Sequence, residues 1–227
     1  MNSRVRVKIC GIGTRDDLAA AVNAGADAIG LIVGTTHLSE DELDIEHARN
    51  LSAAAPIFVS TVLVTHLTKA SRICELAEVL GANTIQAHAT LTAAAARELW
   101  CQRGTRRIIR TVHISGEQSI HEADEASNAA DALLLDTRTE SRLGGTGLTH
   151  DWTISRRIVD RVHPIPVILA GGLAADNVGA AIRAVRPFGV DANSRLKDAT
   201  GRKDPTSCAA FVAAANNNES ASPPLPM

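Results

Sequence analysis

Two residues at the ends of predicted strands carry side chains that can exchange protons with a substrate. Asp136 follows Ala132–Leu135, a run of small and branched apolar residues typical of a strand buried on both faces. Cys10 ends a shorter predicted strand, Val5–Cys10. A carboxyl group serves as a general acid, and an ionised thiol serves as a base or nucleophile. The pair indicates acid–base chemistry if the fold brings the two strand ends together.

Each residue also has a purely structural interpretation. An aspartate after a strand often caps the next turn or helix, and an isolated cysteine is often a small buried hydrophobe. In favour of chemistry, Lys8 and a nearby helix N-terminus would lower the pKa of the Cys10 thiol and favour the thiolate. A glycine-rich segment, Gly144–Gly147, follows Asp136 and is expected to cover it.

The elements that must position these residues alternate regularly between strand and helix. The predicted strands are Val5–Cys10, Ala28–Val33, Ile57–Val64, Thr84–Gln86, Arg107–Val112, Ala132–Leu135, Pro166–Ala170 and Gly189–Ala192. A predicted helix follows each strand, beginning with the helix that ends at Ala24 and finishing with Pro205–Ala215. Parallel strands need helical crossovers, and eight units close most simply into a barrel. We therefore predict an α/β protein, a (β/α)8 TIM barrel forming a single domain over residues 1–215, with a doubly wound open sheet as the alternative. Residues 216–227 are predicted to be a disordered tail.

Composition excludes several classes of function. The chain has 227 residues, a formal net charge of −2, 2% aromatic residues and no tyrosine, which argues against nucleic acid as a partner. No apolar run is long enough to span a membrane, and charged residues occupy the first predicted strand, so a cytoplasmic location without membrane association is expected. The four cysteines include no CxxC pair, which argues against a disulfide framework or a zinc site.

In a barrel, the residues that follow the strands face one shared mouth. Gly171 and Gly172 follow the seventh predicted strand, and Asn193–Ser194 follow the eighth. Loops at these two positions commonly bind phosphate through backbone amides, so these four residues are candidates for a phosphate site. Helix capping by Asp176 or Asn177 is the alternative, and both can hold together.

Four histidines also lie near strand or loop ends: His37, His66, His88 and His113. Imidazoles at a barrel mouth can bind zinc or iron, which makes a metal-dependent lyase or hydrolase one hypothesis. No His-x-His pair comes from one strand, and we favour substrate hydrogen bonding or structural roles instead.

Together these segments resemble a known family. The matching blocks are Val7–Ile12, Gly25–Gly30, Gln86–His88, Leu134–Thr137, Gly144–Gly147, Asp151–Trp152, Gly171–Leu173, Asn177–Val178, Val190–Asp191 and Gly201–Asp204. In this order they resemble the phosphoribosylanthranilate isomerases, the Amadori aldose-ketose isomerases of tryptophan biosynthesis.

The resemblance implies a barrel that isomerises a phosphorylated aminosugar without a cofactor or metal, with Cys10 as general base and Asp136 as general acid. Such a reaction needs both groups, because one proton is delivered to the sugar ring oxygen and another is taken from C2′. We assign substrate binding to Lys8, His37, His88, Arg110 and Gly145, and expect a monomer or homodimer.

The sequence also departs from the family pattern around the substrate. The loop after the second predicted strand, Val33–Glu40, lacks the arginine that in the family meets the anthranilate carboxylate. The family turn Ser-Ser-Gly-Val-Glu is replaced by Asn193–Lys197, and Gln-Leu-His-Gly by Gln86–Ala89. A paralogue acting on a related N-phosphoribosyl amine and a non-catalytic phosphate-binding barrel are therefore alternative hypotheses. His37 and Arg110 are the candidates to replace the missing arginine.

Overall fold

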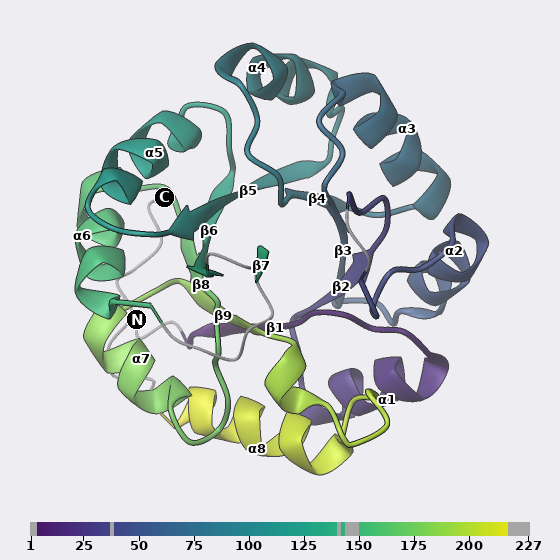
Figure 1. Cartoon of the computed structure of the whole chain (residues 1–227). Helices are drawn as coiled ribbons and strands as arrows, with labels where there is room; N and C mark the ends of the chain where they lie inside the picture. The colour runs from purple at the N-terminus through teal and green to yellow at the C-terminus, as the bar shows by residue number, and fades with distance from the viewer. Residues whose placement is uncertain (1–3, 37–38, 140–141, 144–149, 218–227) are drawn as a thin grey trace.

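The protein folds into a closed barrel of parallel strands surrounded by helices (Figure 1). The computed structural model describes residues 4–36, 39–139, 142–143 and 150–217. The barrel strands are β1 (Arg6–Ile9), β2 (Ala28–Ile32), β3 (Ser60–Thr65), β4 (Thr84–Ala87), β5 (Arg107–Ile114), β6 (Ala132–Thr139), β8 (Val167–Leu169) and β9 (Gly189–Ala192). Each pairs in parallel with two neighbours in the order β5-β4-β3-β2-β1-β9-β8-β6, and β5–β6 pairing closes the ring. The predicted (β/α)8 barrel is confirmed, and the open sheet was wrong.

The helices alternate with the strands and form the outer layer (Figure 1). They are α1 (Arg15–Ala24), α2 (Ile45–Ala54), α3 (Ala70–Leu80), α4 (Ala93–Gln102), α5 (Gln118–Ser127), α6 (Trp152–Val162), α7 (Val178–Val185) and α8 (Pro205–Asn216). Local sequence sets their ends: the Thr14 side chain accepts a hydrogen bond from the Asp17 amide, and Gly25 ends α1 with a left-handed φ of 93°. Among the described helices, none combines the length and apolar character needed to cross a bilayer.

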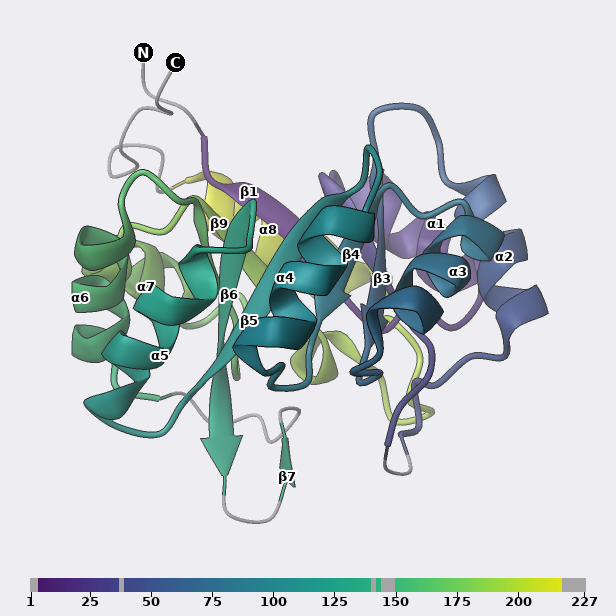
Figure 2. The ribbon, with the colours of Figure 1, turned by 90° about the horizontal axis from the view of Figure 1, so that it is seen from above.

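Some element boundaries differ from the prediction. β6 continues beyond Leu135, first through parallel pairing of Asp136 and Thr137 with β5 and then through antiparallel pairing with a short strand, β7 (Arg142–Leu143), which the sequence did not indicate. Figure 2 shows both projecting from one face of the barrel. β3 begins at Ser60 rather than Ile57, since Phe58 has a left-handed φ of 74° and is exposed. α2 begins at Ile45, where the Asp44 side chain caps it by accepting a hydrogen bond from the His47 amide. The predicted tail was residues 216–227; Asn216 instead ends α8, and residues 218–227 lie outside the described residues.

Strand alternation separates two hydrophobic layers. A small cluster fills the barrel itself, and it includes Cys10, Val62, Ile109 and Leu134. Larger clusters fill the space between the strands and the helices. Residues at alternate positions of one strand therefore face either the barrel interior or the helices. This alternation decides which candidate site residues reach the mouth.

Candidate active site

A cavity of about 290 Å³ lies at the C-terminal ends of the strands and contains most of the residues selected from the sequence. Its lining includes Cys10, His88, Asp136, Gly171, Gly172, Asn193 and Ser194. Cys10 directly follows β1 and Asp136 belongs to β6, and β8 and β9 separate these strands in the ring. The thiol and the carboxyl group thus enter one cavity from separate parts of its wall.

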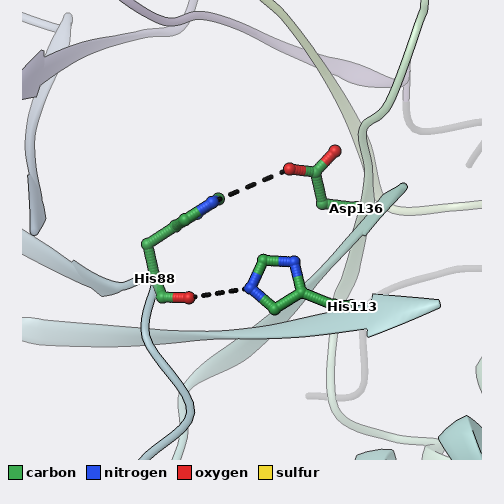
Figure 3. Close-up of side chains that lie close together, drawn as sticks. All are labelled: His88, His113 and Asp136. Carbon is green, nitrogen blue, oxygen red and sulfur yellow. Dashed lines mark hydrogen bonds and ion pairs between the residues drawn. The ribbon is translucent and has the colours of Figure 1, made fainter. Parts of the chain in front are cut away.

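The Asp136 side chain is buried, with 10% of its surface exposed, and one oxygen accepts a hydrogen bond from the Thr137 amide at 2.8 Å. Burial penalises the charged carboxylate and raises the pKa of Asp136 to about 7, although the Thr137 amide opposes the shift. His88 Nε2 lies 3.8 Å from the second oxygen, Oδ2 (Figure 3). An aspartic acid that keeps its proton near neutrality can act as a general acid.

Cys10 is buried against a gap left by a glycine on the neighbouring strand. A Cβ atom at Gly30 of β2 would lie 2.6 Å from the Cys10 sulfur, so only glycine leaves space for the thiol. Burial raises the pKa of Cys10, and the nearby Lys8 and Lys203 ammonium groups offset only part of this effect. The sequence-based expectation of a lowered pKa was therefore wrong, because desolvation outweighs the cations.

Lys8 supports the thiol from inside the barrel. Its Nζ donates to Asp191 Oδ2 at 3.0 Å, and both side chains are buried. Burial alone would lower the pKa of Lys8, but the charges of Asp191 and Cys10 outweigh it and raise the pKa. Lys8 is absent from the described lining of the mouth cavity. It therefore contacts the thiol rather than the space in which a substrate would lie.

Asp191 was part of a sequence block but had received no role. It lies in β9 between Val190 and Ala192 and lines the cavity. Its Oδ1 is buried and has no hydrogen-bond partner among the described residues. The sequence offered one indication of a role for Asp191, a carboxylate in the middle of an apolar strand. In the structure Asp191 is in register with Lys8 of the neighbouring strand.

The histidines occupy different depths. His66 and His88 line the cavity, whereas His113 is not part of its described lining. The Nε2 atom of His113 lies 3.0 Å from the backbone carbonyl oxygen of His88 and hydrogen-bonds to it, whereas the His88 ring points toward Asp136 (Figure 3). Single ligand atoms of His88, His113 and Asp136 lie within 4.8 Å of one another, so these three residues could hold a metal ion.

Arg110 does not lie in the mouth. It alternates with Ile109, which packs inside the barrel, and shares its side of β5 with Ile108 and Val112, which pack toward the helices. The side chain is nevertheless buried, with 7% exposed, and desolvation lowers its pKa. The strand alternation places Arg110 in the outer layer, and the described lining of the mouth cavity does not include it, which argues against the expected substrate contact. His37 and Gly145, also assigned to substrate binding, lie outside the described residues.

The turn after β8 consists of two glycines in left-handed conformations and is contacted by Arg195. Gly171 and Gly172 have left-handed φ values of 86° and 65°. The Arg195 guanidinium reaches back to this turn, where it donates to the Gly172 carbonyl oxygen at 3.3 Å and to Asp176 at 2.7 Å. In the family turn Ser-Ser-Gly-Val-Glu, a glycine stands where this chain has Arg195. Arg195 therefore places a positive charge beside the turn.

Comparisons with known proteins agree with this arrangement. A family model described as "N-(5'phosphoribosyl)anthranilate (PRA) isomerase" matches residues 7–214. The chain is 42% identical to N-(5'-phosphoribosyl)anthranilate isomerase 2 of Methanosarcina mazei over 216 residues, covering 94% of this chain and 95% of that protein. It is similar to the crystal structure of phosphoribosyl anthranilate isomerase from Thermotoga maritima, with 33% identity and a TM-score of 0.83, covering 94% of this chain and 99% of that one. A further similar structure, with 31% identity, a TM-score of 0.80 and coverage of 94% and 99%, is an isomerase in complex with reduced 1-(o-carboxyphenylamino)-1-deoxyribulose 5-phosphate.

Proposed function

The chain belongs to the N-(5'-phosphoribosyl)anthranilate isomerase family, and from this we propose that Cys10 is the general base and Asp136 the general acid of its reaction. The enzyme is an intramolecular oxidoreductase of tryptophan biosynthesis. It converts N-(5-phosphoribosyl)anthranilate into 1-(2-carboxyphenylamino)-1-deoxyribulose 5-phosphate. The observation that supports the assignment of roles is a buried carboxyl group with a pKa of about 7 in the same cavity as a buried thiol.

The proposed steps conserve atoms and charge. Asp136 donates its proton to the furanose ring oxygen, the bond from C1′ to that oxygen breaks, and the nitrogen lone pair forms an iminium group. The Cys10 thiolate then removes the C2′ proton, and the electrons of that C–H bond form the C1′–C2′ double bond of an enolamine. Tautomerisation of the enolamine gives the aminoketose. Hydrogen moves from C2′ to C1′ overall, so the reaction requires no external oxidant or reductant.

The direct test is the removal of substrate fluorescence. Freshly generated N-(5-phosphoribosyl)anthranilate is expected to lose its fluorescence when the purified protein is added. Proton transfer by Cys10 and Asp136 suffices for the reaction, so we expect the same rate after treatment with EDTA. Loss of activity in EDTA, restored by zinc, would instead assign a role to a metal held by His88, His113 and Asp136. No fluorescence change with untreated protein would contradict the proposed function.

We also propose that the glycine turn after β8, with Asn193 and Ser194, binds the substrate phosphate. Because an alanine at Gly172 must adopt a left-handed conformation, Gly172→Ala is expected to displace the backbone amides and raise KM by ~10-fold, with a smaller effect on kcat. Steady-state kinetics of the variant test this expectation. A Cβ atom at Gly171 would clash with Thr137 Oγ1. Gly171→Ala is therefore a comparison variant in which we expect both a higher KM and a lower unfolding temperature. An unchanged KM in Gly172→Ala would place the phosphate elsewhere.

Three expectations about partners and location belong to the same proposal. We propose a monomer or homodimer in the cytoplasm, whose partner is a small phosphorylated aminosugar and not nucleic acid or a membrane. The formal net charge of −2 and the scarcity of aromatic side chains support the exclusion of nucleic acid.

A further inference from the structure

An ion pair crosses the edge of the mouth cavity between two loops. Lys197 follows the short 3₁₀ helix η1 (Ser194–Leu196) after β9, and Asp41 lies in the loop after β2. Lys197 Nζ and Asp41 Oδ1 are 2.6 Å apart, with 13% and 15% of the two side chains exposed. Both residues line the cavity. The pair thus lies in a partly desolvated position where a bound ligand can reach it.

Asp41 does not depend on Lys197 alone. Its other oxygen, Oδ2, accepts a hydrogen bond from Asn193 Nδ2 at 2.9 Å. If the Lys197 ammonium turned toward a ligand, Asp41 would keep this donor. The flexible Lys197 side chain can therefore change partners while Asp41 keeps the hydrogen bond from Asn193.

The substrate needs two cationic contacts, because it carries a phosphate and an aryl carboxylate at opposite ends. Among the described lining residues, the lysine and arginine side chains are those of Arg195 and Lys197. Arg195 is held beside the glycine turn at Gly172, where we place the phosphate. Lys197 is left for the carboxylate. Without it, Glu40 and Asp41 at this edge would repel a second carboxylate.

The order of the strands agrees with this division. The sequence of neighbours β8-β9-β1-β2 places the loop after β2 on the other side of Cys10 from the glycine turn. A substrate with its phosphate at that turn and its reacting carbons beside Cys10 extends its aryl group away from β8. The contact between Lys197 and Asp41 places the ammonium beside the loop after β2.

We propose that Lys197 binds the carboxylate of the anthranilate group and so determines substrate specificity, an inference that rests on the function proposed above. The loop after β2 contains no lysine or arginine between Val33 and Asp44. In this chain the cation is supplied instead from the loop after β9. The ammonium exchanges Asp41 for the substrate carboxylate on binding.

The experiment compares two substrates, N-(5-phosphoribosyl)anthranilate and N-(5-phosphoribosyl)aniline, which lacks the carboxylate. Lys197→Met is expected to lower kcat/KM for the anthranilate compound by ~10- to 100-fold, mainly through KM, because a charge-assisted hydrogen bond is lost. For the aniline compound, which has no carboxylate to lose a contact, kcat/KM should change less than ~3-fold. Lys197→Arg should restore most of the preference for the carboxylate.

Two further variants keep the test decisive. Arg195→Met should raise KM for both substrates by similar factors, since both carry the phosphate. Asp41→Asn removes the competing charge and should lower KM for the anthranilate compound only, which provides a readout even if Lys197→Met fails to fold. Equal effects of Lys197→Met on both substrates, or a higher anthranilate KM in Asp41→Asn, would overturn the proposal. Failure of the unaltered protein to isomerise either compound would contradict the proposed function instead.

Discussion

Asp136→Asn is expected to lower kcat by ~100-fold or more, because an amide cannot deliver the proton that opens the sugar ring. Asparagine has the same shape, and its carbonyl oxygen can still accept the hydrogen bond that the Thr137 amide donates at 2.8 Å. KM should therefore change little. Steady-state kinetics with the anthranilate substrate provide the measurement, and an unaltered kcat would remove Asp136 from the mechanism.

The same substitution should change the pH dependence of stability. The folded-state pKa of Asp136 is raised from 3.8 to about 7, so the folded protein binds an extra proton between these values and its free energy of unfolding falls as pH rises through this range. Asparagine has no such dependence. At pH 8 the variant should be more stable than the parent, by at most about 4 kcal/mol, and the difference should vanish near pH 4. Urea unfolding at pH 5 and pH 8 gives the free energy of unfolding of parent and variant. If the difference between the two proteins were the same at both pH values, Asp136 would be hydrated rather than buried.

The fold was predictable from sequence because a parallel barrel repeats one signal. Apolar strands and capped helices alternate along the whole chain, and eight units close the ring. The extension of β6 to Thr139 depends on pairing with β5 and then with β7, and no local sequence pattern indicates these contacts. The turn before β3 was equally hidden, because Ile57 and Phe58 are apolar but exposed.

The site was less predictable because its energetics depend on contacts distant in sequence. Cys10 directly follows β1 and Asp136 lies in the C-terminal half of β6, and both were found from their positions after apolar runs. The raised pKa of Cys10 depends on burial, which no local sequence pattern reports. Arg110 illustrates a simpler difficulty: a single strand position decides between the mouth and the helix layer. The ion pair between Lys197 and Asp41 joins loops that lie far apart in the chain, so composition alone could not reveal it.

Cys10→Ser is expected to lower kcat/KM by ~100-fold or more, because a hydroxyl group ionises far less readily than a thiol and is a weaker general base. The serine side chain is small enough for the space opposite Gly30. Cys208 provides a matched control, since it is also a fully buried cysteine but lies on α8, outside the mouth cavity. Cys208→Ser should retain parental turnover. Full activity in Cys10→Ser would eliminate the thiol as the base.

The pH profile of the parent enzyme tests the pairing of the two groups. Turnover requires Asp136 with its proton and Cys10 without one, yet the pKa of Asp136 is about 7 and burial raises that of Cys10 above its usual value of 9.0. The active protonation state is thus a minority species at every pH. The parental kcat/KM should rise up to about pH 7, stay nearly level, and fall only above the raised pKa of the thiol. In Cys10→Ser the alkaline fall should disappear from the accessible range, because serine has no comparable ionisation. An alkaline fall retained in Cys10→Ser at the parental pH would assign it to another group and leave the base unidentified.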